Sequence, residues 1–322
     1  VNSGTTALQI SIKALGIKKN DIVVVPSYTF AATANAIIYN DSKPWFVDCD
    51  EQLDLCINLL EKEFKKKTIQ IKNQCYLKSS KERVKGIIPV LTFGKKINFK
   101  KYINFAKKYN LEILFDAAAC HDPSIFKNIM NKKTFNCCFS FNGNKTMTTG
   151  SGGLIASNSK KFIENAKILA NVGKNKSKYD YSVVGFNAKM NNIQAALGMG
   201  QLKNLGNILK RKRKLFNKYS NFFQKGKIKY IHDKNHVNWV FVLILDTKKN
   251  FAKFKKAFHK NNIQFDYFWK PLHLQKPYLN YSKNDLSNTK KFWNKVGILP
   301  SHPGLDTQQQ KKIFKTLKNL IK

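Results

Sequence analysis

The chain has 322 residues, of which 43% are hydrophobic, and a formal net charge of +39. This length suffices for one large domain and a smaller one, and no apolar run reaches the ~20 residues of a membrane span. The basic residues are almost all lysines, the exceptions being Arg83, Arg211 and Arg213. Bidentate contacts to bases and phosphates favour arginine. We therefore expect neither nucleic-acid nor membrane binding, with a basic nucleic-acid-binding protein as the alternative.

The six cysteines form no C-x-x-C pair, and most lie in apolar runs. They predict reduced thiols in the cytoplasm, with no disulfide framework and no bound metal. No signal peptide is visible. The chain starts at Val1 and enters a motif almost at once, so we interpret it as a fragment or as a chain with a trimmed N-terminus.

Short apolar segments alternate with helical periods through the first two thirds of the chain. The expected strands are, in order, 21–26, 45–48, 86–91, 111–115, 136–140 and 153–156. Helices are expected over 6–15, 99–109 and 160–170, the first ending before Gly16. Near-continuous apolar strands are typical of parallel sheets covered on both faces. The predicted fold class is α/β, with a mostly parallel, doubly wound sheet.

The pattern changes after about residue 190. We expect a long helix over 191–219, with the basic run Lys210–Lys214 as its solvated face. The expected elements that follow are a strand over 239–245, a helix over 251–261 and a final helix from about Thr307 to the end. This predicts a large domain over residues 1–200 and a smaller C-terminal α+β domain over residues 201–322.

One lysine has a distinctive setting. Lys145 follows the strand that ends at Ser140, in a turn of small polar residues with a glycine-rich exit. A lysine just past a strand end, in a packed loop, is where Schiff-base chemistry places its amine. The signal is weak by itself because the chain is rich in lysine, so it depends on three other segments.

Each of these three segments has a functional and a structural interpretation. The segment Asn2–Leu8 opens the first helix, where free N–H groups and the Thr5 and Thr6 hydroxyls form either an anion site or an ordinary N-cap. Asp116 ends a buried strand, where ligands gather in open α/β sheets, or it caps a helix. Phe30 either stacks on a planar ring or packs in the core.

A phosphate site, a stacking aromatic, a carboxylate for a pyridinium nitrogen and a Schiff-base lysine are the parts that a pyridoxal phosphate (PLP) site needs. They occur here in the order Thr5, Phe30, Asp116 and Lys145, each at a junction of strand and helix. We therefore predict PLP as the cofactor.

The sequence resembles the DegT/DnrJ/EryC1/StrS sugar aminotransferases, which are fold-type I PLP enzymes. The motifs that carry the resemblance are Ser3–Leu8, Pro26–Asn35, Phe46–Asp48, Asp116–Ala118, Phe139–Lys145, Gly152–Gly153, Val184–Met190, Ile193–Gly198, Pro271–Gln275 and Leu299–Ser301. The resemblance implies that Lys145 is the Schiff-base lysine and proton shuttle, that Asp116 holds the ring nitrogen, and that Phe30 stacks on the ring. The implied phosphate ligands are Thr5, Thr6 and Ser140.

The resemblance also implies a homodimer with composite active sites. Asn187 lies in the segment that, in family members, reaches the phosphate of the neighbouring subunit's cofactor. The implied reaction moves an amino group from L-glutamate to a 4-keto-6-deoxy sugar on UDP or GDP, for surface glycans such as O-antigen. His273 either lines the sugar cleft or is a structural histidine.

The chain departs from the family in three places. Ala119 stands where family members carry Gln, His or Glu near the ring hydroxyl, and the run Phe186–Lys189 replaces a Tyr-Asn-Tyr-Arg type of segment. The segment that precedes the Ser-Gly-Thr motif in relatives is missing. The alternatives are a 3-keto-sugar aminotransferase and a catalytically impaired relative. A sugar dehydratase of the same family would carry His in place of Lys145.

Overall fold

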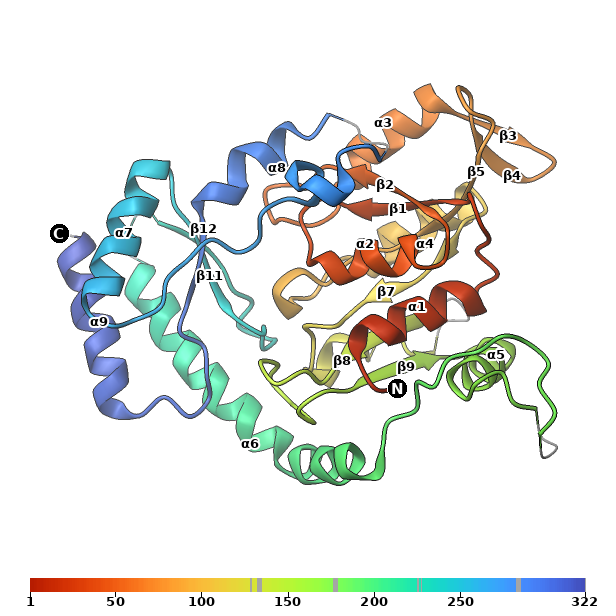
Figure 1. Ribbon diagram of the computed structural model, residues 1–322. Helices are drawn as coiled ribbons and strands as arrows, with labels where there is room; N and C mark the ends of the chain where they lie inside the picture. The colour runs from red at the N-terminus through yellow and green to blue at the C-terminus, as the bar shows by residue number, and fades with distance from the viewer. Residues whose placement is uncertain are drawn as a thin grey trace.

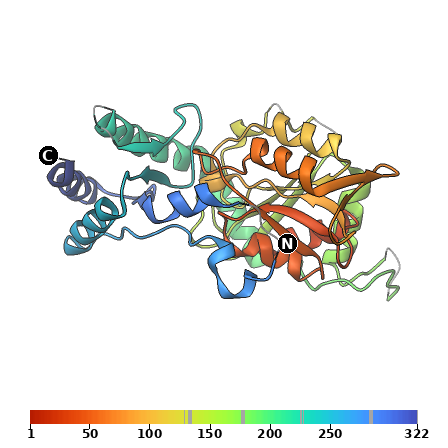
Figure 2. The same ribbon diagram turned by 90° about the horizontal axis from the view of Figure 1, so that it is seen from above.

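The computed structural model describes residues 1–127, 129–131, 135–175, 179–224, 226, 228–281 and 285–321. Two groups of elements lie side by side, as Figures 1 and 2 show. The long helix α6 (Asn192–Phe223) leads from the first group into the second. The predicted boundary between residues 200 and 201 falls inside this helix, and the division into two domains stays a prediction.

The first group is built on two small sheets. The first runs in the order β2 (Lys43–Val47), β1 (Ile22–Pro26), β5 (Arg83–Ile87), β4 (Gln74–Leu77) and β3 (Thr68–Ile71), with β6 (Glu112–Ile113) also on β5. The second comprises β7 (Phe115–Asp116), β8 (Asn136–Ser140) and β9 (Gly153–Ser157). A parallel bridge between Val90 and Asp116 joins the chain segments of the two sheets.

Helices cover both faces of this region. They are α1 (Gly4–Ala14), α2 (Ala31–Ile38), α3 (Ile57–Lys67), α4 (Phe99–Lys108) and α5 (Lys160–Ala170). Val23 and Val25 of β1 pack in the core that α1 and α2 complete. The alternate residues, Ile22 and Val24, pack with α3 and α4. A strand buried on both faces explains why its sequence is continuously apolar.

The α/β class is confirmed, but the strand directions are mixed. β1 runs parallel to β2 and β5, and β7 runs parallel to β8. β9 runs antiparallel to β8, and β4 runs antiparallel to both β3 and β5. The β3–β4 hairpin, which was not predicted, turns through Lys72 and Asn73, both at positive φ. A turn with two such residues matches the twist of a tight hairpin.

The second group contains a three-stranded antiparallel sheet in the order β10 (Lys229–Ile231), β11 (Phe241–Ile244) and β12 (Val296–Leu299). The C-terminal half of α6, together with α7 (Lys248–Lys260) and α9 (Thr307–Ile321), packs an aromatic core against it. Helix α8 (Ser287–Phe292) lies beside the first group, where Asp48 accepts from the Asn288 and Thr289 backbone N–H groups. Short 3₁₀ helices span Thr92–Gly94, Pro123–Ile125, Leu272–Leu274, Lys276–Tyr278 and Trp293–Lys295.

The basic run of α6 is not solvated throughout, so the prediction for it was wrong at one position. Lys212 is only 2% exposed, whereas the other residues of the run are exposed. Its Nζ donates to the carbonyl oxygens of Trp239 and Ser301, both at 2.7 Å. Helical periodicity places Lys212 on the same face as the core residues Leu215 and Phe216.

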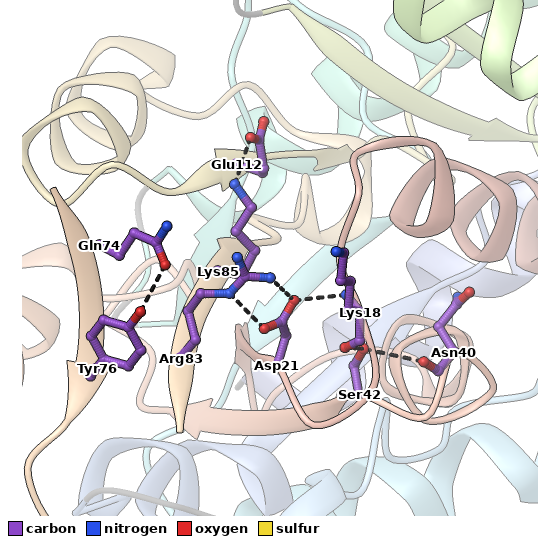
Figure 3. A network of polar contacts seen from close by, with 9 residues as sticks. All are labelled: Lys18, Asp21, Asn40, Ser42, Gln74, Tyr76, Arg83, Lys85 and Glu112. Carbon is purple, nitrogen blue, oxygen red and sulfur yellow. Dashed lines mark hydrogen bonds and ion pairs between the residues drawn. The ribbon is translucent and has the colours of Figure 1, made fainter. Parts of the chain in front are cut away.

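A polar network secures the sheet edge at which β1 and β5 begin (Figure 3). Arg83 donates from Nε and Nη2 to the two carboxylate oxygens of Asp21, at 2.8 and 2.7 Å. Asp21 also accepts from the backbone N–H of Lys18, and Lys85 pairs with Glu112 on β6. A bidentate pair fixes geometry as well as charge. At the opposite edge, where β1 and β5 end, the residues that follow these strands line a cavity.

The six cysteines are free thiols, all of them buried except Cys56, which is half-buried. The prediction that the thiols are buried is confirmed for five of the six, and their reduced state stays a prediction. Among the described residues, no helix has the length and apolar character needed to cross a membrane.

Candidate active site

A cavity of about 370 Å³ opens at the carboxyl ends of the strands of the first group. This is the edge at which open α/β sheets hold their ligands. Its volume is in the range of small-molecule sites. Among the residues that line it are Ser3, Gly4, Thr5, Phe30, Thr33, Asp116, Ala119, Ser140, Asn144, Lys145, Trp239 and Trp269. Residues far apart in the sequence therefore meet around one space.

The N-terminus of α1 forms one wall of the cavity. Ser3 is the N-cap, and its Oγ accepts from the Thr6 backbone N–H at 3.0 Å. A Cβ on Gly4 would lie 2.6 Å from Cβ of Ser140, so only glycine allows the helix to approach the end of β8 this closely. Thr5 lines the cavity, while the Thr6 hydroxyl pairs with Ser3 Oγ at 2.8 Å. A helix N-terminus of this kind favours an anion.

Asp116 presents a buried carboxylate to the same cavity from the end of β7. Thr33 Oγ1 donates to its Oδ2 at 2.8 Å, and the Ala118 backbone N–H donates to its Oδ1 at 3.0 Å. Burial raises the pKa of this carboxyl, while these two hydrogen bonds and the charge of Lys145 oppose the rise. Such a carboxylate is poised for a cationic partner. No regular helix begins at Asp116, so the helix-cap alternative is not supported.

Lys145 lies in the loop between β8 and β9, with its backbone N–H donating to Asn142 O at 3.0 Å. Its Nζ sits over the ring of Trp239, 4.0 Å from the centroid. Burial lowers the pKa of Lys145 to about 8, although the negative charge of Asp116 acts in the opposite direction. A sizeable fraction of the amine is therefore neutral near pH 8, which is the form that attacks a carbonyl.

Phe30 stands at the N-cap position of α2 and is 58% exposed. Its ring lines the cavity and lies 6.3 Å from the ring of Trp269. The alternative that Phe30 packs in the core is therefore wrong. An exposed ring on a cavity wall has a free face for a planar ligand.

The remaining predicted residues occupy different places. Ser140 lines the cavity beside Gly4. Asn187 is exposed and lies outside the cavity of its own chain. His273 is 3% exposed, its Nδ1 pairs with Ser27 Oγ at 2.6 Å, and it does not line the cavity. The structure therefore brings Thr5, Phe30, Asp116, Ser140 and Lys145 together around the cavity.

Sequence reasoning assigned no role to several residues of the site. Thr33 lies in the same motif as Phe30. Its position in the first turn of α2, three residues after Phe30, could have indicated that its hydroxyl faces the same site. Trp239 is separated from Lys145 in the sequence by the whole of α5 and α6, and no local pattern points to it. His121, two positions after Ala119, does not line the cavity, but it is buried and its Nε2 lies 2.8 Å from Ser140 O, on a residue that does. Burial lowers the pKa of His121 to about 4, so it is neutral at physiological pH.

The donor set fits the predicted cofactor. An amine, a buried carboxylate, an exposed aromatic face and a helix N-terminus stand around one cavity. These groups match the aldehyde, the ring nitrogen, the ring plane and the phosphate of PLP in chemical type. Ala119 offers no polar side chain to the ring hydroxyl, which agrees with the departure noted from the sequence.

Comparisons with known proteins point the same way. The model of the DegT/DnrJ/EryC1/StrS aminotransferase family matches residues 1–318. The chain is 28% identical to GDP-perosamine synthase of Vibrio cholerae, over 99% of this chain and 85% of that protein. It is 30% identical to the UDP-4-amino-4,6-dideoxy-N-acetyl-beta-L-altrosamine transaminase of Campylobacter jejuni (strain 81-176), over 70% of this chain and 57% of that protein. The crystal structure of NtdA from Bacillus subtilis with bound cofactor PMP superposes with a TM-score of 0.84, at 25% identity, over 99% of this chain and 72% of that one.

Proposed function

The chain belongs to the DegT/DnrJ/EryC1/StrS aminotransferase family, and we propose that it transfers the amino group of L-glutamate to a 4-keto-6-deoxy sugar linked to UDP or GDP. The protein is an aminotransferase, and its cofactor is PLP. The observation that carries the proposal is the meeting of Asp116, Lys145 and the α1 N-terminus around one cavity.

The chain's own residues would hold the cofactor in stated ways. The α1 N-terminus, with Thr5 and Ser140, would bind the phosphate, and Phe30 would cover one face of the ring. Thr6 contributes its backbone N–H to this helix end, since its hydroxyl is already paired with Ser3. When bound, PLP supplies an electron sink that permits the exchange of an amino group and a proton.

Lys145 and Asp116 would have different roles in the reaction. The Lys145 amine binds the cofactor and then takes and returns a proton, a role that suits a pKa of about 8. Asp116, held in place by Thr33 and the Ala118 N–H, would keep the ring nitrogen protonated. The net reaction is balanced: L-glutamate becomes 2-oxoglutarate, and the keto sugar becomes an amino sugar.

The choice of substrate is supported by the resemblance and by relatives. The names of the two relatives in the comparison include a GDP-linked and a UDP-linked amino sugar. The motif Phe139–Lys145 resembles members that aminate C4 of 4-keto-6-deoxy sugars. A place in the assembly of surface glycans such as O-antigen follows from this choice. His273 stays a prediction as a residue of the sugar cleft.

A homodimer in the cytoplasm completes the proposal. Large apolar side chains are exposed on the segment before α6 and on the first turns of α6, in the order Tyr179, Val184, Ile193, Leu197, Met199 and Leu202. Large apolar side chains exposed in this number along one stretch of chain are typical of an interface. Asn187 lies in the same stretch, which supports its assignment to the partner's site. The free thiols support a reducing compartment.

The test has two stages. The visible absorption of the protein is recorded after PLP is added, for the wild type and for Lys145→Ala, and again with L-glutamate. A colour that requires Lys145 and is bleached by glutamate supports the first half of the reaction. Turnover of candidate keto-sugar nucleotides, with product regiochemistry from NMR, then separates amination at C4 from amination at C3. A wild type that stays colourless overturns the proposal and favours a catalytically impaired relative.

A further inference from the structure

Trp239, which no sequence pattern singled out, lies directly against the amine of Lys145. It precedes β11, comes from the second group of elements, and is 8% exposed. The Lys145 Nζ is 4.0 Å from the centroid of its ring, well within the reach of a cation–π contact.

Trp239 also holds the loop that carries Lys145. Its Nε1–H donates to the carbonyl oxygen of Asn144, the residue before Lys145, at 2.8 Å. The indole thus contacts both the backbone next to the lysine and the end of the lysine side chain. Two contacts to neighbouring residues restrict the amine far more than either contact alone.

The Trp239 backbone is itself fixed from two sides. Its N–H donates to Phe93 O at 2.8 Å, and its carbonyl oxygen accepts from Lys212 Nζ at 2.7 Å. Phe93 belongs to the first group, and Lys212 belongs to α6. The indole therefore has a defined position relative to both groups, and a reacting amine benefits from such a support.

We propose that Trp239 is a positioning residue for Lys145: its indole N–H anchors the loop, and its ring face holds Nζ at the cavity wall and stabilises the protonated amine. This inference rests on the proposed function, in which Lys145 is the reacting amine. An amine that gains and loses a proton in each cycle needs both forms to be accessible. Burial alone disfavours the ammonium form, and the negative face of an indole offsets part of that effect.

The test measures the protonation of Lys145 in the protein without cofactor, so it does not depend on transamination. The protein is acetylated competitively over a range of pH, and mass spectrometry reads the extent of acetylation at Lys145. The variants are Trp239→Leu, which removes the ring face, and Trp239→Phe, which keeps a face but loses the N–H. Trp45→Phe is the matched control, because Trp45 is buried against Phe64 on another core.

In Trp239→Leu the apparent pKa of Lys145 falls by about one pH unit, since the contact that favours the ammonium is gone. Trp239→Phe lowers it by less, and Trp45→Phe leaves it unchanged. An apparent pKa in Trp239→Leu that equals or exceeds the wild-type value overturns the proposal. Circular dichroism checks that each variant is folded.

A second measurement applies even where Trp239→Leu does not fold. Tryptophan is replaced throughout the chain by analogues with one, two or three ring fluorines, which weaken the negative face and preserve its shape. The apparent pKa of Lys145 should fall stepwise with fluorination. No trend with fluorination overturns the role of the ring face.

The two hypotheses can fail separately. If Lys145→Ala still transaminates while the labelling shows the expected shifts, the proposed function fails and the contact stands. If transamination requires Lys145 but the apparent pKa of Lys145 does not change when Trp239 is substituted, the positioning role is wrong and the proposed function still holds.

Discussion

Thr33 Oγ1 donates a hydrogen bond of 2.8 Å to Oδ2 of Asp116, across 83 positions of the sequence. The hydroxyl comes from α2, which follows β1 of the first sheet, and the carboxylate from the end of β7 in the second sheet, so the bond links the two sheets of the first group. Thr33 in turn lies 3.1 Å from the Thr29 hydroxyl. The buried carboxylate at the cavity is therefore oriented by a chain of hydroxyl groups.

Replacing Thr33 by Val removes this donor while keeping the side-chain shape. The pKa of Asp116, already raised by burial, should rise further, because a hydrogen bond to the charged form is lost. We expect PLP to bind about 10- to 100-fold more weakly, the range for a hydrogen bond to a charged group. The loss should be larger at pH 6 than at pH 8, since a further rise in this pKa favours the protonated carboxyl more strongly as pH falls.

Titration of the visible absorption with PLP measures this effect. Thr316→Val is the matched control, because the Thr316 hydroxyl donates to Lys312 O within α9 and is buried far from the cavity. Equal binding of PLP by Thr33→Val and the wild type at both pH values would contradict the role of Thr33.

Asp116→Asn keeps the size of the side chain and removes its charge. We expect the half-reaction with L-glutamate to slow by about 100-fold or more, as for the loss of one oriented electrostatic group in an active site. The pKa of Lys145 should fall below its present value of about 8, because the negative charge that raises it is gone. Stopped-flow absorbance gives the rate, with Asp285→Asn at an exposed position as the control. An unchanged rate would remove Asp116 from the mechanism.

The uptake of PLP should depend on pH through Lys145. Only the neutral amine attacks the cofactor aldehyde, and burial lowers the Lys145 pKa to about 8. The initial rate of PLP attachment should therefore rise between pH 6 and pH 9 with a midpoint near 8. Borohydride trapping followed by mass spectrometry locates the attachment site. A midpoint near the ordinary lysine value would show that the amine is solvated in solution.

Lys212 should make stability depend on pH. Burial lowers its pKa from 10.5 to about 7 in the folded protein, so the unfolded chain binds more protons between these values. The contribution of Lys212 to the free energy of unfolding therefore increases as pH rises above 7, and it decreases as pH falls toward 7. Relative to Lys212→Met, the wild type should gain about 2.5 kcal/mol of unfolding free energy from pH 6 to pH 9.

Urea unfolding of both proteins at the two pH values measures this gain. Lys214→Met, at an exposed position of the same helix, is the control and should show no such difference. A wild type whose stability relative to Lys212→Met is constant from pH 6 to pH 9 would mean that Lys212 is solvated when it is charged.

The proposed dimer predicts a specific sensitivity on α6. Leu197 is 53% exposed, and a charge at this position would be buried in the interface. Leu197→Glu should therefore convert the dimer to a monomer in sedimentation velocity experiments. Ile71→Glu changes an apolar residue of similar exposure on the β3–β4 hairpin and should leave the dimer intact. A wild type that sediments as a monomer would contradict the dimer itself.

Local sequence signals predicted the first group well. The apolar run before Pro26 became β1, and the helical period ending at Gly16 became α1, with Gly16 at a φ of +71° as its C-terminal glycine. These features depend on neighbours in the chain, so periodicity and turn residues suffice to find them. Strand direction depends on how segments pair, and the antiparallel placements of β4 and β9 were not predicted.

Basic residues show the limit of patterns even more clearly. Lys210–Lys214 is a uniform run of positive charge. Lys212 alone is buried, because α6 packs against the sheet of the second group with the face that carries it. Its two carbonyl acceptors, on Trp239 and Ser301, lie 27 and 89 positions away. A helix face becomes buried when something packs on it, and composition does not record that.

The sequence by itself predicted four residues that line the cavity, each at or after the end of a strand, namely Phe30, Asp116, Ser140 and Lys145, because ligands of α/β proteins gather where strands end. It also determined the family, since the motifs extend along nearly the whole chain. Only the tertiary structure decided that Thr33 orients Asp116 and that Trp239 supports Lys145. Those contacts join segments 83 and 95 positions apart through short-range forces, which act only after the chain has folded.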